Sequence, residues 1–193
     1  MSTCKKCHKL TINEGLCNDC KRNEEQKKSL NLKATKLLNT LTHGEYHNYI
    51  VNQSKTFGTE FFYEFIWAPI QFEGRTYHHW SRVSDLKIGD KIFNSRNGKI
   101  EGISIVTKEA VIKNFPEKTN DPKYNEEGWY VECKSRRLSK PLDLNNYIEE
   151  RKKLGQYNNS PFDKNGDFCK GYLFPLNDEL TDIFENDIQK YKY

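Results

Sequence analysis

Long apolar runs are absent from this sequence. None of its 193 residues belongs to an uninterrupted stretch of 18 apolar residues, which is the length that a membrane-spanning helix requires. Residues 1–9 also lack the apolar segment of a secretory signal peptide. We therefore expect a cytoplasmic protein without a membrane partner, and in that compartment its thiols stay reduced.

Methionine occurs only once, whereas phenylalanine and tyrosine occur 11 times each. Aromatic residues make up 13% of the chain, which excludes a disordered chain because such chains are poor in aromatic side chains. With 193 residues the chain is long enough for one full domain with a small appendage. We expect a core built mainly of aromatic and β-branched side chains.

A strong charge of one sign is also missing, since the formal net charge is only +4. The excess lies at the N-terminus: residues 1–36 hold nine Lys and Arg against four Asp and Glu, and the remaining residues hold 22 against 23. A basic N-terminal segment fits an anionic partner, and it fits a solvated lysine-rich helix equally well.

Four of the six cysteines form two matched pairs, Cys4 with Cys7 and Cys17 with Cys20. Each C-x-x-C pair can form a tight turn that directs both sulfurs to one point, and two such turns make a tetrahedral site for Zn²⁺. A redox pair or disulfides are the alternatives, and two matched pairs in a reducing compartment disfavour both. We expect a structural Zn²⁺ in a module of residues 1–22, whose docking target stays open.

The leucine spacing over residues 21–42 is that of an amphipathic helix, and Gly44 is suited to end it. We therefore expect a linker helix at 23–44 and a main domain at 45–193.

Within the main domain, short aromatic and β-branched runs are separated by turn signals such as Asn97-Gly98. Because strands outnumber helices, we expect an α+β fold, namely a small mixed β-barrel with peripheral helices. The expected strands are 46–52, 60–70, 90–95, 99–112, 128–138 and 171–176, and the expected helices are 142–155 and 177–193, with Asn177 or Asp178 as the N-cap.

Several segments of the main domain, in their order, resemble a known family. They are Asn52-Gln53-Ser54-Lys55, Trp67-Ala68, residues 89–93 (GDKIF), residues 100–106 (IEGISIV) and residues 128–134 (GWYVECK). This ordered set resembles the YTH and EVE domains of the PUA-like superfamily, and more closely the reader domains of bacterial modification-dependent restriction systems. Residues 160–174 also resemble the closing segment of those readers. The resemblance covers about residues 46–184 and implies a PUA-like barrel of the YTH/EVE type.

Domains of that family bind a modified base that is flipped out of its strand into a cage of aromatic rings. The resemblance therefore implies a non-enzymatic reader of a methylated base, with DNA as the expected polymer and RNA as the alternative. Trp67 stands where the family has its first cage tryptophan, and its other reading is a core residue. Trp80 either covers the pocket or seals the barrel. Residues 107–128 lack the family's second tryptophan, which leaves Phe115 and Tyr124 as candidates there.

The segment 52–55 has the short polar side chains that base-edge hydrogen bonds require, and basic side chains near the expected groove can neutralise phosphates. The candidate base-binding residues are Asn52, Gln53, Ser54, Trp67, Ala68, Trp80, Phe115 and Tyr124, and the candidate phosphate-binding residues are Lys55, Arg75, Arg136 and Arg137.

Two other functions stay open. Glu132 and Lys134 form the E-x-K pattern of a metal-dependent nuclease, with Asp121 upstream. The alternative is an adaptor whose zinc module docks another protein. Readers of this kind are usually fused to a nuclease domain, which these residues do not contain. We therefore expect a separate nuclease or effector subunit as a partner, or a longer chain of which this is one part.

Overall fold

The computed structural model describes residues 2–3, 10–11, 47–116 and 121–190. The chain divides into two compact units, Met1–Glu45 and Tyr46–Tyr193. In the first unit, strand β1 (Ser2–Thr3) pairs antiparallel with β2 (Leu10–Thr11). In the described part of the chain, no helix has the length and apolar character needed to cross a bilayer.

The expected zinc module and linker helix lie almost entirely outside the described residues. This applies to all four cysteines of the module, Cys4, Cys7, Cys17 and Cys20, and to the whole segment 23–44. Both therefore stay predictions from the sequence.

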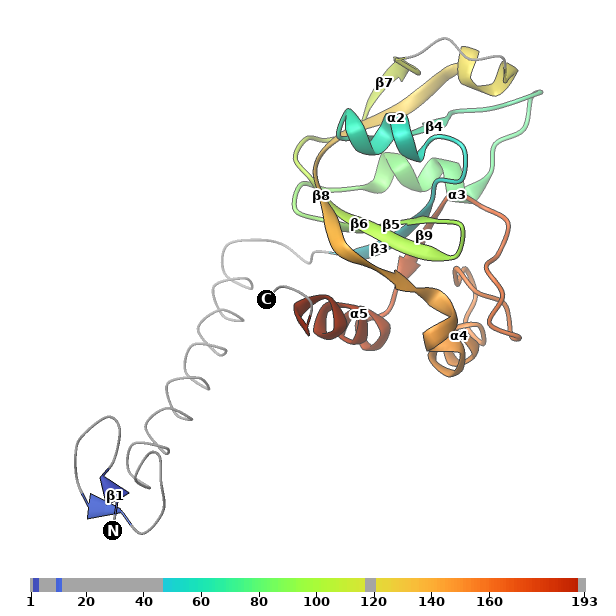
Figure 1. Cartoon of the computed structure of the whole chain (residues 1–193). Helices are drawn as coiled ribbons and strands as arrows, with labels where there is room; N and C mark the ends of the chain where they lie inside the picture. The colour runs from blue at the N-terminus through green and yellow to red at the C-terminus, as the bar shows by residue number, and fades with distance from the viewer. Residues whose placement is uncertain (1, 4–9, 12–46, 117–120, 191–193) are drawn as a thin grey trace. The chain divides into compact units, whose positions relative to one another are not determined.

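The second unit is a mixed α+β fold around a curled sheet in the strand order β4-β8-β6-β5-β3-β9, with β7 also paired to β8 (Figure 1). Only the β3–β5 pair is parallel among these. The long β8 pairs with β4 and β7 near its start and with β6 further along. The strands are β3 (Asn48–Asn52), β4 (Phe65–Pro69), β5 (Lys91–Arg96), β6 (Lys99–Val106), β7 (Val111–Asn114), β8 (Glu127–Asp143) and β9 (Leu173–Leu176).

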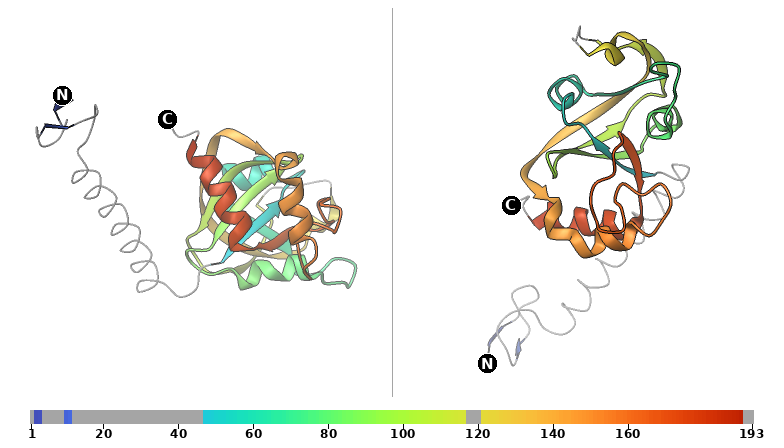
Figure 2. Two further views of the ribbon diagram at one scale, coloured as in Figure 1. Left: turned by 90° about the horizontal axis from the view of Figure 1, so that it is seen from below. Right: turned by 90° about the vertical axis from the view of Figure 1, so that its right-hand side faces the viewer.

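Helices lie on both sides of this sheet. The views agree that α4 and α5 lie on one side, with α2 and α3 toward the other (Figures 1 and 2). The α-helices are α2 (Phe57–Phe62), α3 (His78–Ser81), α4 (Ile148–Leu154) and α5 (Asp178–Lys190), and the 3₁₀ turns are η1 (Arg82–Asp85), η2 (Pro122–Asn125) and η3 (Leu144–Tyr147).

Strand alternation explains the two main apolar clusters. Successive side chains of a strand point to opposite faces, so Phe93 and Ile92 of β5 enter different clusters. Phe93 packs against Phe184 of α5, with 5.5 Å between ring centroids. Ile92 packs in the other cluster, which also contains Val83 of η1. Burial of side chains of this size contributes about 2–3 kcal/mol each, so both faces of the sheet stabilise the unit.

Several sequence predictions of local structure are confirmed. Asn97 and Gly98 have φ of 52° and 73°, the left-handed conformations of a type I′ hairpin turn between β5 and β6. The side chain of Asn177 accepts a hydrogen bond from the Leu180 N–H (3.1 Å) and so caps α5. The expected strands at 46–52, 90–95 and 171–176 match β3, β5 and β9.

Other boundaries were wrong. The expected strand 60–70 is two elements, because α2 continues to Phe62 and β4 begins only at Phe65. Phe57 and Glu60, three residues apart, are the buried side of α2, so helical periodicity overrides the strand preference of the aromatic residues. Trp80 lies in α3, at a position where the sequence predicted neither a helix nor a strand. The helix expected over 142–155 starts later, because Leu142 still pairs with β6.

Candidate functional site

A pocket of about 330 Å³ lies where β3 and β4 end. Residues of five separate segments line it. From the β3–α2 segment come Asn52, Ser54, Lys55 and Thr56; from β4, Trp67, Ala68 and Pro69; from α3, His79 and Trp80; from η2, Lys123 and Tyr124; and from the segment before β9, Lys170, Gly171 and Tyr172. The fold therefore brings together seven residues that the sequence indicated, namely Asn52, Ser54, Lys55, Trp67, Ala68, Trp80 and Tyr124.

Trp67 lines this pocket, but its ring is covered. The residue is only 1% exposed, and the indole Nε1–H donates a hydrogen bond to the Lys113 carbonyl (2.8 Å). The indole lies directly against Gly128, where an added Cβ would stand 2.2 Å from the ring. Of the two roles considered for Trp67, its burial therefore favours the core, and other rings must supply an open stacking surface.

A cluster of rings supports Trp67 from behind. Phe115 is buried, and its ring meets Trp67 edge-on at 5.2 Å between centroids. Tyr124 is tilted against Trp67 at 5.6 Å and is half-buried. Because Phe115 is absent from the pocket lining while Tyr124 is part of it, only one of the two candidates for the second wall reaches the pocket.

The α3 wall carries a second group of rings. Trp80 is half-buried and meets Tyr77 edge-on at 4.6 Å. Nδ1 of His79 accepts a hydrogen bond from the Tyr172 N–H (3.2 Å), and burial lowers the pKa of this imidazole. His79 is thus held as a neutral side chain, and the partly exposed rings of the pocket are those of Trp80, Tyr124, Tyr172 and His79 itself.

Directly behind the pocket lies a fully buried carboxylate, Glu60. Its Oε1 accepts hydrogen bonds from the Tyr172 hydroxyl (2.5 Å) and the Trp67 N–H (3.3 Å). Its Oε2 accepts from Gln53 Nε2 (2.6 Å) and the Thr56 hydroxyl (2.7 Å). Burial is the largest cause that raises the pKa of Glu60, to about 7, and the hydrogen bonds only partly offset it.

Lysines surround the pocket entrance. Lys55 and Lys123 each lie near Asp121, at Nζ–Oδ2 distances of 3.8 and 3.7 Å, and Lys170 is exposed. The ammonium of Lys123 also lies over the Tyr124 ring, 4.7 Å from its centroid. Three lysines against one aspartate leave the rim with an excess of positive charge, which suits an anionic polymer.

Sequence reasoning missed Glu60 and several of the lining residues. Glu60 is one of two acids in a run of aromatic residues, and nothing in the sequence distinguishes it from Glu64, which is only partly buried and pairs with Lys134. His79 lies in a histidine pair that the sequence shows, but its role depends on the distant Tyr172. Thr56, Lys123 and Lys170 give no sequence signal of their own.

Besides Phe115, four candidate residues do not line the pocket. Gln53 is buried and bonds Glu60 instead of lining the cavity. Arg75 is exposed in the turn that it forms with Phe72. Arg137 pairs with Glu101 (3.0 Å). Arg136 lines a separate groove, because β8 at this point pairs with β6 and has left β4. The structure does not bring these three arginines to Lys55.

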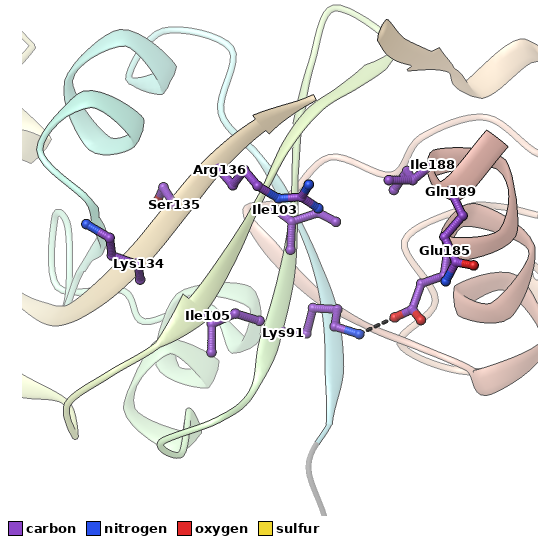
Figure 3. Close-up of a pocket in the computed structure, with 9 residues that line it drawn as sticks. All are labelled: Lys91, Ile103, Ile105, Lys134, Ser135, Arg136, Glu185, Ile188 and Gln189. Atoms are coloured by element: carbon purple, nitrogen blue, oxygen red, sulfur yellow. Dashed lines mark hydrogen bonds and ion pairs between the residues drawn. The ribbon is translucent and has the colours of Figure 1, made fainter. Parts of the chain in front are cut away.

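The separate groove has a volume of about 560 Å³ and lies between α5 and the strands β5, β6 and β8 (Figure 3). Ile103, Ile105 and Ile188 give it an apolar surface, and an ion pair between Lys91 and Glu185 spans one side (Figure 3). None of its described lining residues is aromatic, so it offers no ring for stacking on a base.

The residues of the alternative nuclease function are engaged in separate ion pairs. Glu132 pairs with Lys108 (2.7 Å), Lys134 pairs with Glu64 (3.1 Å), and Asp121 lies at the pocket rim. Among the described residues, no three or more His, Cys, Asp or Glu side chains lie together so that they could hold a metal ion.

A scan against protein-family models and a search of curated proteins give no match. Solved structures do match. A hypothetical protein from Leishmania major has a TM-score of 0.50 at 11% identity, over 77% of this chain and 98% of that chain, and shares its overall fold. Human THYN1 in complex with 5-methylcytosine-containing DNA has a TM-score of 0.44 at 11% identity, over 76% of this chain and 98% of that one.

The YTH domain of Pho92 in complex with m6A has a TM-score of 0.46 at 13% identity, over 78% of this chain and 86% of that one. A YTH domain, the kind of domain that the sequence resembles, is thus among the matching structures.

The contact between Gly128 and Trp67 predicts the effect of an added methyl group. In the Gly128→Ala variant the indole must move, and we expect the free energy of unfolding to fall by about 1–3 kcal/mol in urea titration. Gly58→Ala is the matched control, because no atom lies within 4 Å of its added Cβ in α2; we expect it to be about 0.4–1 kcal/mol more stable than wild type. Equal stability of wild type and Gly128→Ala would contradict the packing described.

The buried Glu60 predicts a fall in stability as pH rises. The pKa of Glu60 is about 7 in the folded protein, against an ordinary value of 4.5 that applies to the unfolded chain. Between pH 4.5 and pH 7 the folded protein therefore keeps a proton that the unfolded chain releases. The wild type should therefore lose about 2 kcal/mol of unfolding free energy relative to Glu60→Gln between pH 5 and pH 8, measured by urea titration at both pH values. A difference between the two proteins that does not change with pH contradicts this.

Proposed function

We propose that the second unit binds a methylated base, flipped out of a DNA strand, in the pocket lined by Trp80 and Tyr124. One observation carries the proposal: five separate segments bring partly exposed rings, short polar side chains and a lysine rim into one cavity. The sequence resemblance indicates the same kind of ligand and the same segments.

The pocket has the size and surfaces that such a ligand requires. A volume of about 330 Å³ lies within the range of small-molecule sites. Flipping a base costs a few kcal/mol, and stacking on aromatic side chains contributes about 1–3 kcal/mol per base. A buried methyl group adds about 0.8 kcal/mol, which gives a methylated base an advantage over its unmodified form.

The positive charges of the pocket lie at its rim and not in its interior. Lys55, Lys123 and Lys170 lie at the rim, where phosphates of a bound strand would pass, while the interior next to the pocket holds the uncharged His79 and the shielded Glu60. A neutral base enters an interior that offers no cation, and the anionic backbone stays with the lysines.

Two of the structures that match this chain are complexes with a modified base, namely THYN1 with 5-methylcytosine-containing DNA and the YTH domain of Pho92 with m6A. The proposal for this chain is supported by its own pocket and by the sequence motifs. DNA in preference to RNA, the non-enzymatic role and a separate effector subunit are parts of the proposal that follow from the sequence resemblance.

The binding test compares oligonucleotides that differ only in one methyl group, in DNA and in RNA form, by fluorescence anisotropy. We expect the wild type to prefer the methylated DNA strand. Because Trp80 offers a stacking face, Trp80→Ala should bind it about 5- to 100-fold more weakly. Tyr157→Ala is the control, since this ring is 68% exposed and does not line the pocket. Equal affinity of all proteins for all strands would reject the proposal.

We also propose that Cys4, Cys7, Cys17 and Cys20 hold one structural Zn²⁺, on the strength of their spacing. Elemental analysis of the full chain should then give about one zinc per molecule, because four thiolates fill a closed tetrahedral site. The double variant Cys17→Ser/Cys20→Ser should lose the metal, whereas Cys169→Ser should keep it. Unchanged zinc content in the double variant would show that these thiolates are not ligands.

A further inference from the structure

A second cavity, here called the α2 groove, adjoins the pocket at the start of α2. It has a volume of about 420 Å³. Phe57, Phe61 and Phe62 line it from α2, and Arg96 of β5 and Arg137 of β8 line it from the sheet. Residue 56 lines the pocket and residue 57 lines the groove, so the two cavities meet at consecutive positions of the chain.

Two rings of the groove form an ordered stack. Phe57 and Phe61 lie nearly parallel, with 4.9 Å between their centroids and 9° between their planes. The guanidinium carbon of Arg96 lies 4.5 Å from the centroid of the Phe57 ring. The Phe61 ring rests against Gly102 of β6, where an added Cβ would stand 2.4 Å from it. Contacts with β5 and β6 therefore hold both rings in place.

Phe62 extends this aromatic surface into solvent. It is 76% exposed, which is the largest value among the large apolar side chains of the described residues. The ring of Tyr63, which is also exposed, lies perpendicular to it at 5.0 Å between centroids. The Phe62 ring therefore has a neighbour that restrains it and still keeps a surface open to a ligand. Open rings next to cations are the surface on which the bases of a single strand stack.

The groove also offers donors for a phosphate. Glu101 of β6 accepts hydrogen bonds from Nη2 of Arg96 (3.1 Å) and from Nη2 of Arg137 (3.0 Å). The Glu101 side chain is only 12% exposed, whereas that of Arg137 is 64% exposed. Because a guanidinium group has five N–H donors, Arg137 keeps donors for an anionic ligand on its exposed side. The other carboxylate of the groove, Glu64, is paired with Lys134 (3.1 Å).

We propose that the α2 groove binds a nucleotide that flanks the modified base in the same strand, with its base stacked on Phe62 and its phosphate at Arg137. This inference rests on the proposed function. Exposed rings and arginine donors that continue directly from the pocket favour a nucleic-acid strand over a protein partner. Because every base has a face that can stack, the groove adds affinity that does not depend on methylation.

The length of α2 suits neighbouring nucleotides. Its six residues span about 9 Å at a rise of about 1.5 Å per residue. Successive phosphates of a stacked strand are about 3.4 Å apart along the axis, so α2 is as long as a stack of two or three nucleotides. Lys55, whose side chain is 78% exposed, lies at the pocket end of this path, and Arg137 lies in the groove.

The test uses single-stranded DNA oligonucleotides in two matched pairs, with 5-methylcytosine or cytosine in one pair and N6-methyladenine or adenine in the other. Each full-length strand carries this base in its middle. Two shortened forms end at the base itself, one without the nucleotides on its 5′ side and one without those on its 3′ side. Dissociation constants are measured by fluorescence anisotropy, and thermal melting confirms that each protein is folded.

Phe62→Ala should bind the methylated and the unmethylated full-length strands about 5- to 100-fold more weakly than the wild type does, and so keep the ratio between them. The wild type should show a similar loss with one of the two shortened strands, because the flanking base is missing. Phe62→Ala and the wild type should bind that shortened strand equally. The control is Tyr157→Ala, which removes an exposed ring outside the groove and should bind as the wild type does.

A second variant tests the phosphate contact. Arg137→Gln should weaken both full-length strands and reduce the slope of log affinity against log salt concentration by about 0.7, the contribution of one phosphate in a single strand. Arg75→Gln is the control, since Arg75 is exposed and lines neither cavity. An unchanged salt slope in Arg137→Gln would reject this contact.

The outcomes separate this inference from the function on which it rests. If Phe62→Ala binds every strand as the wild type does, the inference is rejected, the exposed rings are left for a protein partner, and a preference for methylated strands still supports the proposed function. If Phe62→Ala loses that preference and keeps its affinity for unmethylated strands, the ring belongs to the base pocket and the inference is also rejected. If the wild type binds methylated and unmethylated strands equally, the proposed function fails, whereas weaker binding by Phe62→Ala still supports a strand in the groove.

Discussion

The pocket depends on the burial of the Glu60 carboxylate. Four donors hold it: the side chains of Gln53, Thr56 and Tyr172 and the N–H of Trp67. They come from the β3–α2 segment, β4 and the segment before β9, which are far apart in sequence. Because an unsatisfied buried charge would cost several kcal/mol, each donor has to be in place, and the carboxylate thereby fixes three walls of the cavity relative to one another.

Burial of the carboxylate also separates two electrostatic environments within a short distance. The lysines at the rim are partly or fully exposed, and Lys55 and Lys123 share the neighbouring Asp121. The Glu60 charge is satisfied by neutral hydroxyl, amide and backbone donors and not by these lysines. The rim therefore keeps its cations for an anionic ligand, while the interior keeps a carboxyl group with a pKa near neutrality.

Much of the fold could be predicted from local patterns. Three features depend only on residues that are close together in the sequence: the strand at 46–52, the Asn97-Gly98 turn and the Asn177 cap. The alternation of side chains along a strand, the left-handed conformation of turn residues and the capping of a helix all act within a few residues. The segment 60–70 could not be predicted in this way. Its aromatic residues favour a strand. The helix α2 forms because Phe57 and Glu60 are buried by partners from β4, β5 and the segment before β9, which a local pattern does not contain.

The sequence by itself determined which residue types are present and the order of the segments that line the pocket, so Asn52, Ser54, Trp80 and Tyr124 could be named in advance. Only the tertiary structure decided which ring faces the cavity. Trp67 is covered because the antiparallel pairing of β4 with β8 sets its indole against Gly128, and Trp80 is left partly open on α3. Burial of this kind depends on contacts between residues about 60 to 110 positions apart, and such contacts leave no periodic signal in the chain.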